Sequence, residues 1–142
     1  MLDTEGHLKI TDFGLSKVCL KRTYTMCGTL DYIAPEILTH KGHDCGADYW
    51  ALGVVIFEML SGLPPFYCRD NDLGTVNKIL HREIDWPRKL DGNARDLIEK
   101  LLCVDVSHRF GCMAAGAEDI KRHYWFDQVR LLLLLVVVVP RS

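Results

Sequence analysis

Apolar residues recur at helical spacing in four segments, all in the second two-thirds of the chain. The strongest of these segments covers residues 47–60 and is apolar nearly all round, which is typical of a helix buried in the protein interior. It is too short to span a bilayer, and Asp48 and Glu58 lie within it. A glutamate on so apolar a helix needs a cationic partner or access to solvent. The remaining helices are predicted at 73–82, 93–103 and 117–125.

The N-terminal part of the chain has a different pattern. The segment 7–11 (His-Leu-Lys-Ile-Thr) alternates polar and apolar residues after the turn signal Glu5-Gly6, which predicts a short, half-buried strand. Residues 12–34 have no sustained period and contain Gly14 and Gly28, so we interpret them as a long ordered loop. Loops of this length in compact domains are often functional. The pattern as a whole predicts a mainly helical body with one strand pair, a short β-hairpin, at the front.

The chain ends in an apolar run that differs from everything before it. Five leucines and four valines follow one another at 131–139, without helical or strand period. Three interpretations are open: an aberrant end from read-through, frameshift or an alternative exon, which we favour; a buried extension of a strand or helix; and a membrane anchor. The run is far shorter than a membrane span and is uncharged and rich in valine, so we expect self-association rather than insertion.

Composition narrows the class of protein further. The 142 residues are 49% hydrophobic and 25% charged, as in an ordinary globular domain. The net charge of −2 gives no global field that would attract nucleic acid or an anionic membrane, so neither is expected as a partner. The six cysteines contain no C-x-x-C pair and match no zinc spacing. Their even number allows disulfides, but we favour free thiols of a cytoplasmic or nuclear protein because the N-terminus lacks a signal-peptide pattern.

Three short motifs carry chemistry. Asp12-Phe13-Gly14 follows the predicted strand, and a carboxylate at a strand end beside a glycine can hold Mg²⁺ against nucleotide phosphates. Alone, these three residues are better explained as a turn. They are followed, however, by Cys27-Gly28-Thr29, Tyr32 and Ala34-Pro35-Glu36, in an order that chance rarely supplies.

This ordered series resembles protein kinases of the cyclic-AMP-dependent type, in the AGC group. The matching segments are 9–14 (KITDFG), 25–29 (TMCGT), 33–36 (IAPE), 49–53 (YWALG), 64–66 (PPF), 104–105 (VD), 109–111 (RFG) and 119–120 (DI). The stretch from 57 to 102 most resembles the protein kinase X branch of that group. The resemblance covers residues 1–126 and implies the large, C-terminal lobe of the α+β protein-kinase fold, with residues 127–142 as a tail foreign to the family.

The resemblance implies a cofactor site and a regulatory site in the long loop. Asp12 would be the Mg²⁺ ligand that holds ATP, and Thr25 would be the activation-loop phosphothreonine. A phosphate on Thr25 adds charge and acceptor oxygens, which order such a loop by pairing with basic groups. Arg22 and Lys17 are the local candidates for that pairing.

The resemblance also assigns residues to peptide binding. Met26, Leu30 and Ile33 match the pocket for the apolar residue that follows the target serine. Leu30 replaces a proline that is usual in this group, so the pocket is expected to be altered. Thr29 matches the hydroxyl that contacts the catalytic base; no base itself is retained.

Three carboxylates and one buried ion pair complete the residues that the resemblance assigns. Glu58 matches a carboxylate that binds a substrate arginine, and Asp31 would assist in place of the family's glutamate. Glu36 and Arg109 match a buried ion pair that joins the loop to the last helices. Asp48 matches a buried aspartate that holds the backbone of the catalytic loop.

The implied activity is transfer of phosphate from ATP to serine or threonine in basic peptides, with a cyclic-AMP-dependent regulatory subunit as a further partner. The chain contains no G-x-G-x-x-G and no H-R-D…N segment. Family spacing puts the catalytic-loop asparagine two residues before Met1. We therefore expect a fragment without the small lobe and the base, inactive alone, in which the helix at 47–60 has an uncovered face. The alternatives are a non-catalytic decoy that binds substrates or the regulatory subunit, and a product without function.

Overall fold

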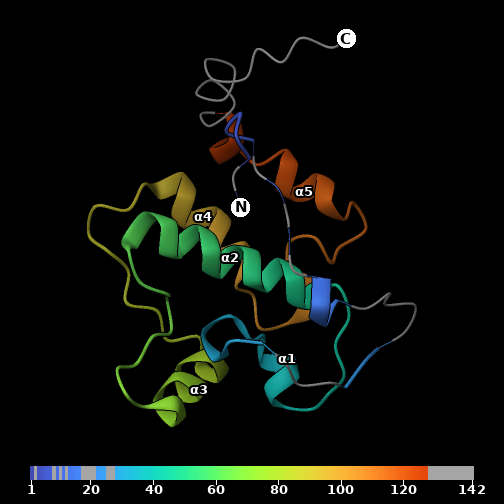
Figure 1. The fold of residues 1–142 in the computed structure, drawn as a ribbon, viewed down its shortest axis with the longest axis vertical. Helices are drawn as coiled ribbons and strands as arrows, with labels where there is room; N and C mark the ends of the chain where they lie inside the picture. Colours follow the sequence, from blue (N-terminus) through green and yellow to red (C-terminus); the bar gives the residue numbers. More distant parts are fainter. Residues whose placement is uncertain are drawn as a thin grey trace.

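The computed structural model describes residues 1, 3–7, 9, 11, 13–16, 22–24 and 28–127. Within them the chain is mainly helical, as the hydrophobic pattern predicts (Figure 1). The α-helices are α1 (Pro35–Leu38), α2 (Gly46–Ser61), α3 (Asp72–His81), α4 (Gly92–Leu101) and α5 (Ala117–Lys121). Short 3₁₀ turns lie at η1 (Phe13–Leu15), η2 (Leu30–Tyr32) and η3 (Val106–His108). None of the helices in the described part of the chain is both long and apolar enough to cross a membrane.

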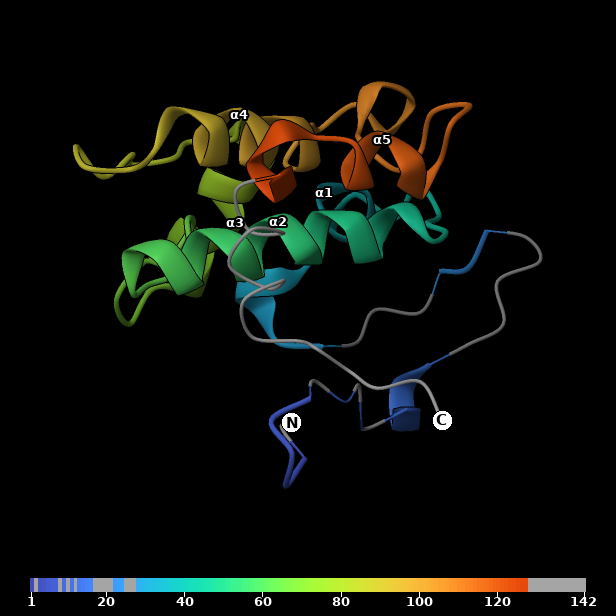
Figure 2. The same ribbon diagram turned by 90° about the horizontal axis from the view of Figure 1, so that it is seen from above.

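Helix α2 is the centre of the fold. Figure 2 shows α4 and α5 together along one side of it, and α4 makes the most extensive contact with α2. Trp50 and Leu101 are fully buried in the shared core. Gly53 allows the close approach, because a Cβ built there would lie 2.9 Å from the Cβ of Leu101. The apolar face of α2 therefore forms the core against which the other helices pack.

One face of α2 is uncovered. Asp48, Leu52, Val55 and Met59 recur at intervals of four, three and four residues, which places them in one stripe along the helix. Leu52 is 37% exposed and Met59 is 69% exposed. The hydrophobic pattern predicted a helix that is buried all round, which is wrong for this face. The family resemblance, in contrast, implied an uncovered face on this helix. Asp48, which the resemblance matches to a buried aspartate, is exposed in this chain; its role toward the catalytic loop stays a prediction.

Side-chain caps set the starts of two helices. Asp91 accepts hydrogen bonds from the backbone N–H groups of Asn93 and Ala94, each at 3.0 Å, which fixes the first turn of α4. Asn71 caps α3 in the same way, accepting from the N–H of Gly74 at 2.9 Å. Helix α5 is shorter than predicted, because the chain turns at 122–123 before residues 124–127 become helical again.

The front of the chain forms a hairpin-like pairing. The N-terminal amine of Met1 donates to the carbonyl of Lys9 at 2.9 Å, and the N–H of Lys9 donates back at 2.8 Å. Asp3 donates in turn to the carbonyl of His7 at 3.0 Å. Elsewhere in the described ranges, antiparallel pairing is limited to one isolated bridge, between Thr23 and His43. The predictions for the tail concern 128–142, which lie outside the described residues.

Candidate functional site

The turn η2 positions the residues that the sequence assigned to peptide binding. Its two ends are closed by backbone hydrogen bonds, from Tyr32 to Thr29 and from Ile33 to Leu30, both at 3.1 Å. The turn contacts α2 and α3, and Ile33 is buried with 7% of its surface exposed. Leu30 and Asp31 are half-buried on the same turn. The local structure therefore presents Leu30 and Asp31 from a short, anchored segment.

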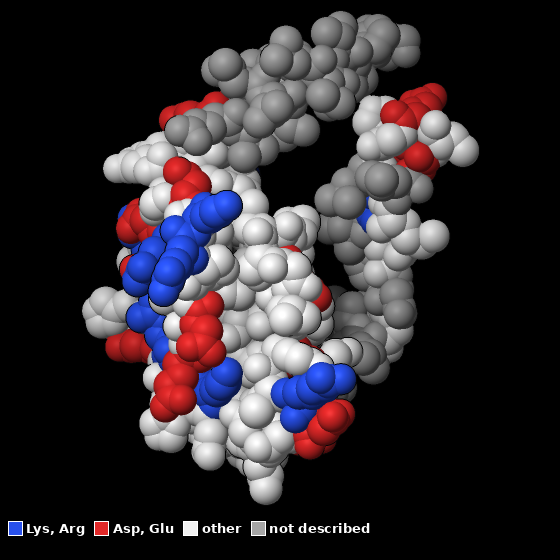
Figure 3. All heavy atoms as spheres, turned by 90° about the vertical axis from the view of Figure 1, so that its left-hand side faces the viewer, with Lys and Arg blue, Asp and Glu red and all other residues white. Residues whose placement is uncertain are grey.

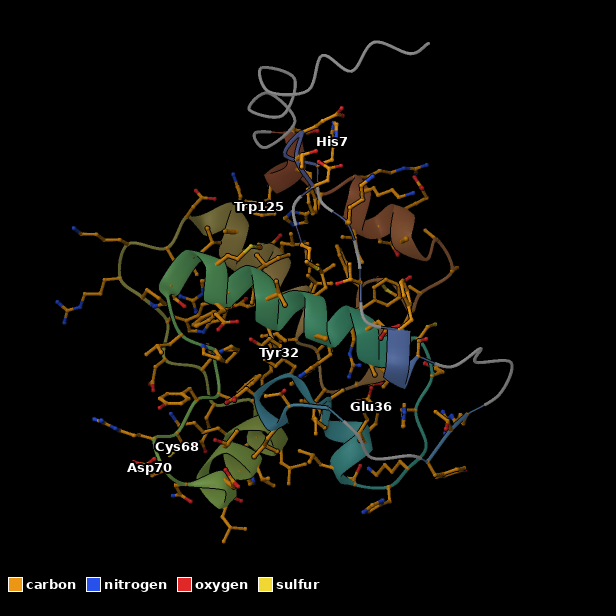
Figure 4. The ribbon with its side chains drawn as sticks, in the orientation of Figure 1. His7, Tyr32, Glu36, Cys68, Asp70 and Trp125 are labelled. Carbon is orange, nitrogen blue, oxygen red and sulfur yellow. The ribbon has the colours of Figure 1, made fainter. Side chains whose placement is uncertain are left out.

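Glu58 of α2 is joined to this turn through Tyr32. The phenol of Tyr32, which Figure 4 labels, donates a hydrogen bond of 2.5 Å to Oε2 of Glu58, and both side chains are partly buried. This hydrogen bond, together with desolvation and the charges of Glu58 and Asp31, raises the pKa of Tyr32 to about 12. Oε1 of Glu58 stays available to a further donor, since no hydrogen bond to it is recorded among the described residues. The carboxylate is thus held in one orientation at the edge of the helix.

Sequence reasoning did not find Tyr32 as the partner of Glu58. The sequence indicated that Glu58 needs a cation or solvent, whereas the structure provides a neutral phenol donor and partial exposure. The two residues are 26 positions apart, so no local pattern connects them. The sequence offered two separate clues: a lone acidic residue on an apolar helix, and a tyrosine within the series of motifs.

We expect Tyr32→Phe to remove one late step from the spectrophotometric tyrosine titration. Because the pKa of Tyr32 is raised from 10.0 to about 12, the stability from this hydrogen bond is full below pH 10 and is lost as pH rises towards 12. At pH 8 the variant should lose about 1 kcal/mol of unfolding free energy. Tyr49, whose pKa burial also raises, serves as the internal reference. Identical titrations of variant and wild type at 295 nm would contradict the assignment.

Glu36 and Arg109 form a buried ion pair with two hydrogen bonds. Arg109 Nη1 donates to Glu36 Oε1 at 2.7 Å, and Nη2 donates to Oε2 at 2.9 Å. Arg109 is fully buried and also donates to the carbonyls of Gly46 and Cys103, both at 2.9 Å. The structure therefore brings together the two residues that the family resemblance paired. Their contacts tie α1, the start of α2 and the segment after α4 to one guanidinium. Figure 4 labels Glu36 on α1.

The remaining predicted site residues of the long loop are Asp12, Thr25, Met26 and Thr29. Asp12, Thr25 and Met26 lie outside the described residues, so neither the Mg²⁺ site nor the phosphosite can be located. In the described ranges no group of three or more His, Cys, Asp or Glu residues could hold a metal ion. Thr29 is exposed, and its hydroxyl makes no capping hydrogen bond to η2.

Figure 3 shows acidic and basic side chains interspersed over the described part of the face that it draws. A surface cavity of about 620 Å³ is lined by Arg22, Glu36, Lys41 and Asp105 among others, but not by Leu30, Ile33 or Glu58. The candidate site is therefore the open face formed by η2 and Glu58, not this cavity.

Residues 1–126 match the family model of the protein kinase domain. The chain belongs to the protein kinase family, which confirms the resemblance seen in its motifs, and kinases of this family use ATP and Mg²⁺.

Several of the similar curated proteins are cyclic-AMP-dependent kinases. The chain is 57% identical to the cAMP-dependent protein kinase catalytic subunit PRKX of Mus musculus, over 91% of this chain and 36% of that protein. It is 53% identical to the cAMP-dependent protein kinase catalytic subunit 3 of Drosophila melanogaster, over 91% of this chain and 22% of that protein. It is 49% identical to the cAMP-dependent protein kinase catalytic subunit of Dictyostelium discoideum, over 91% of this chain and 20% of that protein. The chain spans 36% or less of the length of these relatives.

Proposed function

We propose that this chain is the peptide-docking part of a serine/threonine protein kinase that phosphorylates basic peptides. The observation that carries the proposal is the carboxylate of Glu58, oriented by Tyr32 at 2.5 Å and partly open to solvent. A fixed, partly desolvated carboxylate forms stronger charge-assisted hydrogen bonds to a guanidinium than a freely rotating one, because less rotamer entropy is lost on binding.

The residues beside Glu58 would set the orientation of a bound peptide. Leu30 and Ile33 supply apolar surface on the turn that Tyr32 closes, and Asp31 adds a second carboxylate. A peptide with an arginine near the target residue and an apolar residue after it would meet Glu58 with the first and the turn with the second. Asp12, with Mg²⁺ and ATP, and a phosphate on Thr25 belong to the same proposal; phosphopeptide mapping of the protein from its native source would test Thr25.

Peptide binding by the chain tests the role of Glu58. In fluorescence anisotropy with a labelled arginine-containing peptide, we expect Glu58→Gln to weaken binding about tenfold, since a charged hydrogen bond contributes about 1.5–3 kcal/mol. Glutamine can still accept from Tyr32, so the fold is preserved. Glu83→Gln, which removes an exposed carboxylate that the resemblance does not assign to the site, is the matched control and should bind as the wild type does.

Two results would contradict this role. One is equal loss of affinity in Glu58→Gln and Glu83→Gln, which would indicate attraction by net charge alone. The other is unchanged discrimination between the arginine peptide and its alanine-substituted form in Glu58→Gln.

We expect no ATP-dependent phosphotransfer from the isolated chain. Its 142 residues include no Gly-rich phosphate loop and no H-R-D…N segment, and these groups position the nucleotide and the attacking hydroxyl. Radiolabelled ATP, Mg²⁺ and a basic peptide provide the assay. Peptide phosphorylation that disappears in Asp12→Ala would contradict the expectation.

A decoy is the second candidate, because the residues that the resemblance assigns to peptide docking are in this chain while the H-R-D…N segment is not. Such a chain would bind basic substrates, or the pseudosubstrate segment of a regulatory subunit, without phosphorylating them. Peptide binding without phosphotransfer supports this candidate, and phosphotransfer excludes it. In the kinase itself, the uncovered stripe of Leu52, Val55 and Met59 on α2 would pack against the part of the lobe that this chain does not include.

A further inference from the structure

Two cysteines from distant parts of the sequence line one surface cavity. Cys45 directly precedes α2, and Cys112 follows Arg109 by three residues. Both line a cavity of about 390 Å³, together with Asp44, Ser107 and other residues. Both are free thiols; Cys45 is exposed and Cys112 is half-buried. Neither residue has a role in the peptide site.

The backbones that carry these cysteines are held against each other. A Cβ built on Gly46, the residue after Cys45, would lie 3.0 Å from Sγ of Cys112, so this sulfur lies against the start of α2. Arg109 donates to the carbonyl of Gly46 at 2.9 Å, and Cys112 donates its N–H to the carbonyl of Arg109 at 3.0 Å. Asp44 accepts from the N–H of Gly46 at 2.9 Å. The proximity of the two cysteines therefore depends on the folded arrangement.

The two thiols differ in accessibility. Cys45 makes no side-chain capping bond to α2 and is open to solvent, so a small oxidant can reach it. Burial raises the pKa of the Cys112 thiol, with Arg109 acting in the opposite direction and Asp44 and Cys45 adding to the rise. Cys45 is consequently the thiol to be oxidised first, and Cys112 is the thiol placed to react with it.

We propose that Cys45 and Cys112 form a reversible disulfide when the protein meets hydrogen peroxide. The Cys45 thiolate attacks one peroxide oxygen; an S–O bond forms, the O–O bond breaks and hydroxide leaves, giving a sulfenic acid. The Cys112 thiolate then attacks the Cys45 sulfur; the S–S bond forms, the S–O bond breaks and hydroxide leaves again. The two thiol protons and the two hydroxides make two waters, and the two electrons lost by the thiols reduce the peroxide.

The disulfide would join the start of α2 to the turn after Arg109. The Arg109–Gly46 hydrogen bond already connects these two segments. A cross-link between positions so far apart in sequence restricts the unfolded chain more than the folded one, so it stabilises the fold. Oxidation should therefore raise the thermal midpoint by several degrees, and a reducing agent should reverse the rise.

Peptide mapping tests the pairing. The protein is treated with hydrogen peroxide, remaining thiols are blocked with N-ethylmaleimide, and the digest is analysed by mass spectrometry with and without reduction. We expect a linked peptide pair containing Cys45 and Cys112 to dominate, and reduction to separate it. The same treatment in urea should spread pairing over the six cysteines. Cys45→Ser and Cys112→Ser should each lose the linked pair and the thermal shift, whereas Cys68→Ser should keep both.

Either of two results would overturn the proposal, and neither depends on a variant that must fold. The first is that peroxide in native buffer oxidises Cys45 to sulfinic acid or to mixed disulfides, with no link to Cys112. The second is a Cys45–Cys112 link that is as abundant in urea as in native buffer. Circular dichroism before oxidation verifies that the wild-type chain is helical in native buffer.

Discussion

Arg109→Ala is expected to lower the free energy of unfolding by about 3–5 kcal/mol. The substitution leaves Glu36 as a buried carboxylate without its two donors at 2.7 and 2.9 Å. It also removes the donors to the carbonyls of Gly46 and Cys103. The free-energy cost of leaving a buried charge unpaired and of losing these hydrogen bonds is larger than the net stabilisation that the ion pair itself provides. Urea unfolding followed by circular dichroism at neutral pH measures the change.

Two comparisons make this expectation specific. Lys121→Ala breaks an exposed pair with Glu118 at 2.9 Å and should change stability by at most about 0.5 kcal/mol. Replacing both buried partners, with Glu36→Leu and Arg109→Met together, should be less harmful than Arg109→Ala alone, because no buried charge is left unpaired. A single variant no less stable than the double variant would be inconsistent with this account.

Gly111→Ala is expected to destabilise the fold by about 3 kcal/mol, from two separate causes. Gly111 has a φ of +91°, a conformation that L side chains rarely adopt. A Cβ at this position would also lie 2.5 Å from the ring of Tyr49, so the ring or the backbone must move. The turn after Arg109 can therefore take this path only with glycine.

Gly62→Ala separates the two causes and is measured by the same urea unfolding. Gly62 ends α2 with a φ of +89°, nearly the same as that of Gly111, but no atom lies within 4 Å of a Cβ built there. This substitution should cost only about 1 kcal/mol, the conformational part alone. Equal effects of the two substitutions would show that Tyr49 yields freely and that the contact is unimportant.

The longer helices were predictable because their apolar positions repeat over several turns. The prediction of 47–60 lies within one residue of α2 at each end. Helix α1 was not predicted, because four residues (Pro35–Leu38) cannot show a period. The break after Lys121 was also missed, since the apolar pattern continues through the turn.

The site was less predictable than the fold, because its contacts join residues far apart in sequence. Periodicity says nothing of the bond between Tyr32 and Glu58, and the pairing of Glu36 with Arg109 came only from the family resemblance. The sequence favoured free thiols, which the structure confirms for Cys45, Cys68, Cys103 and Cys112. Only the folded backbone places Cys45 beside the Cys112 segment. The exposure of Asp48 depends on which other segments lie against α2, and the sequence of α2 alone does not determine that.

The ion pair of Glu36 with Arg109 has a consequence for folding kinetics. Its partners are 73 positions apart, so the chain between them must be ordered before the pair can form. Helices α2 and α4 both lie inside that interval and can pack first. A contact made after the rate-limiting step slows unfolding without accelerating refolding. The pair should therefore determine how long the folded lobe persists rather than how quickly it forms.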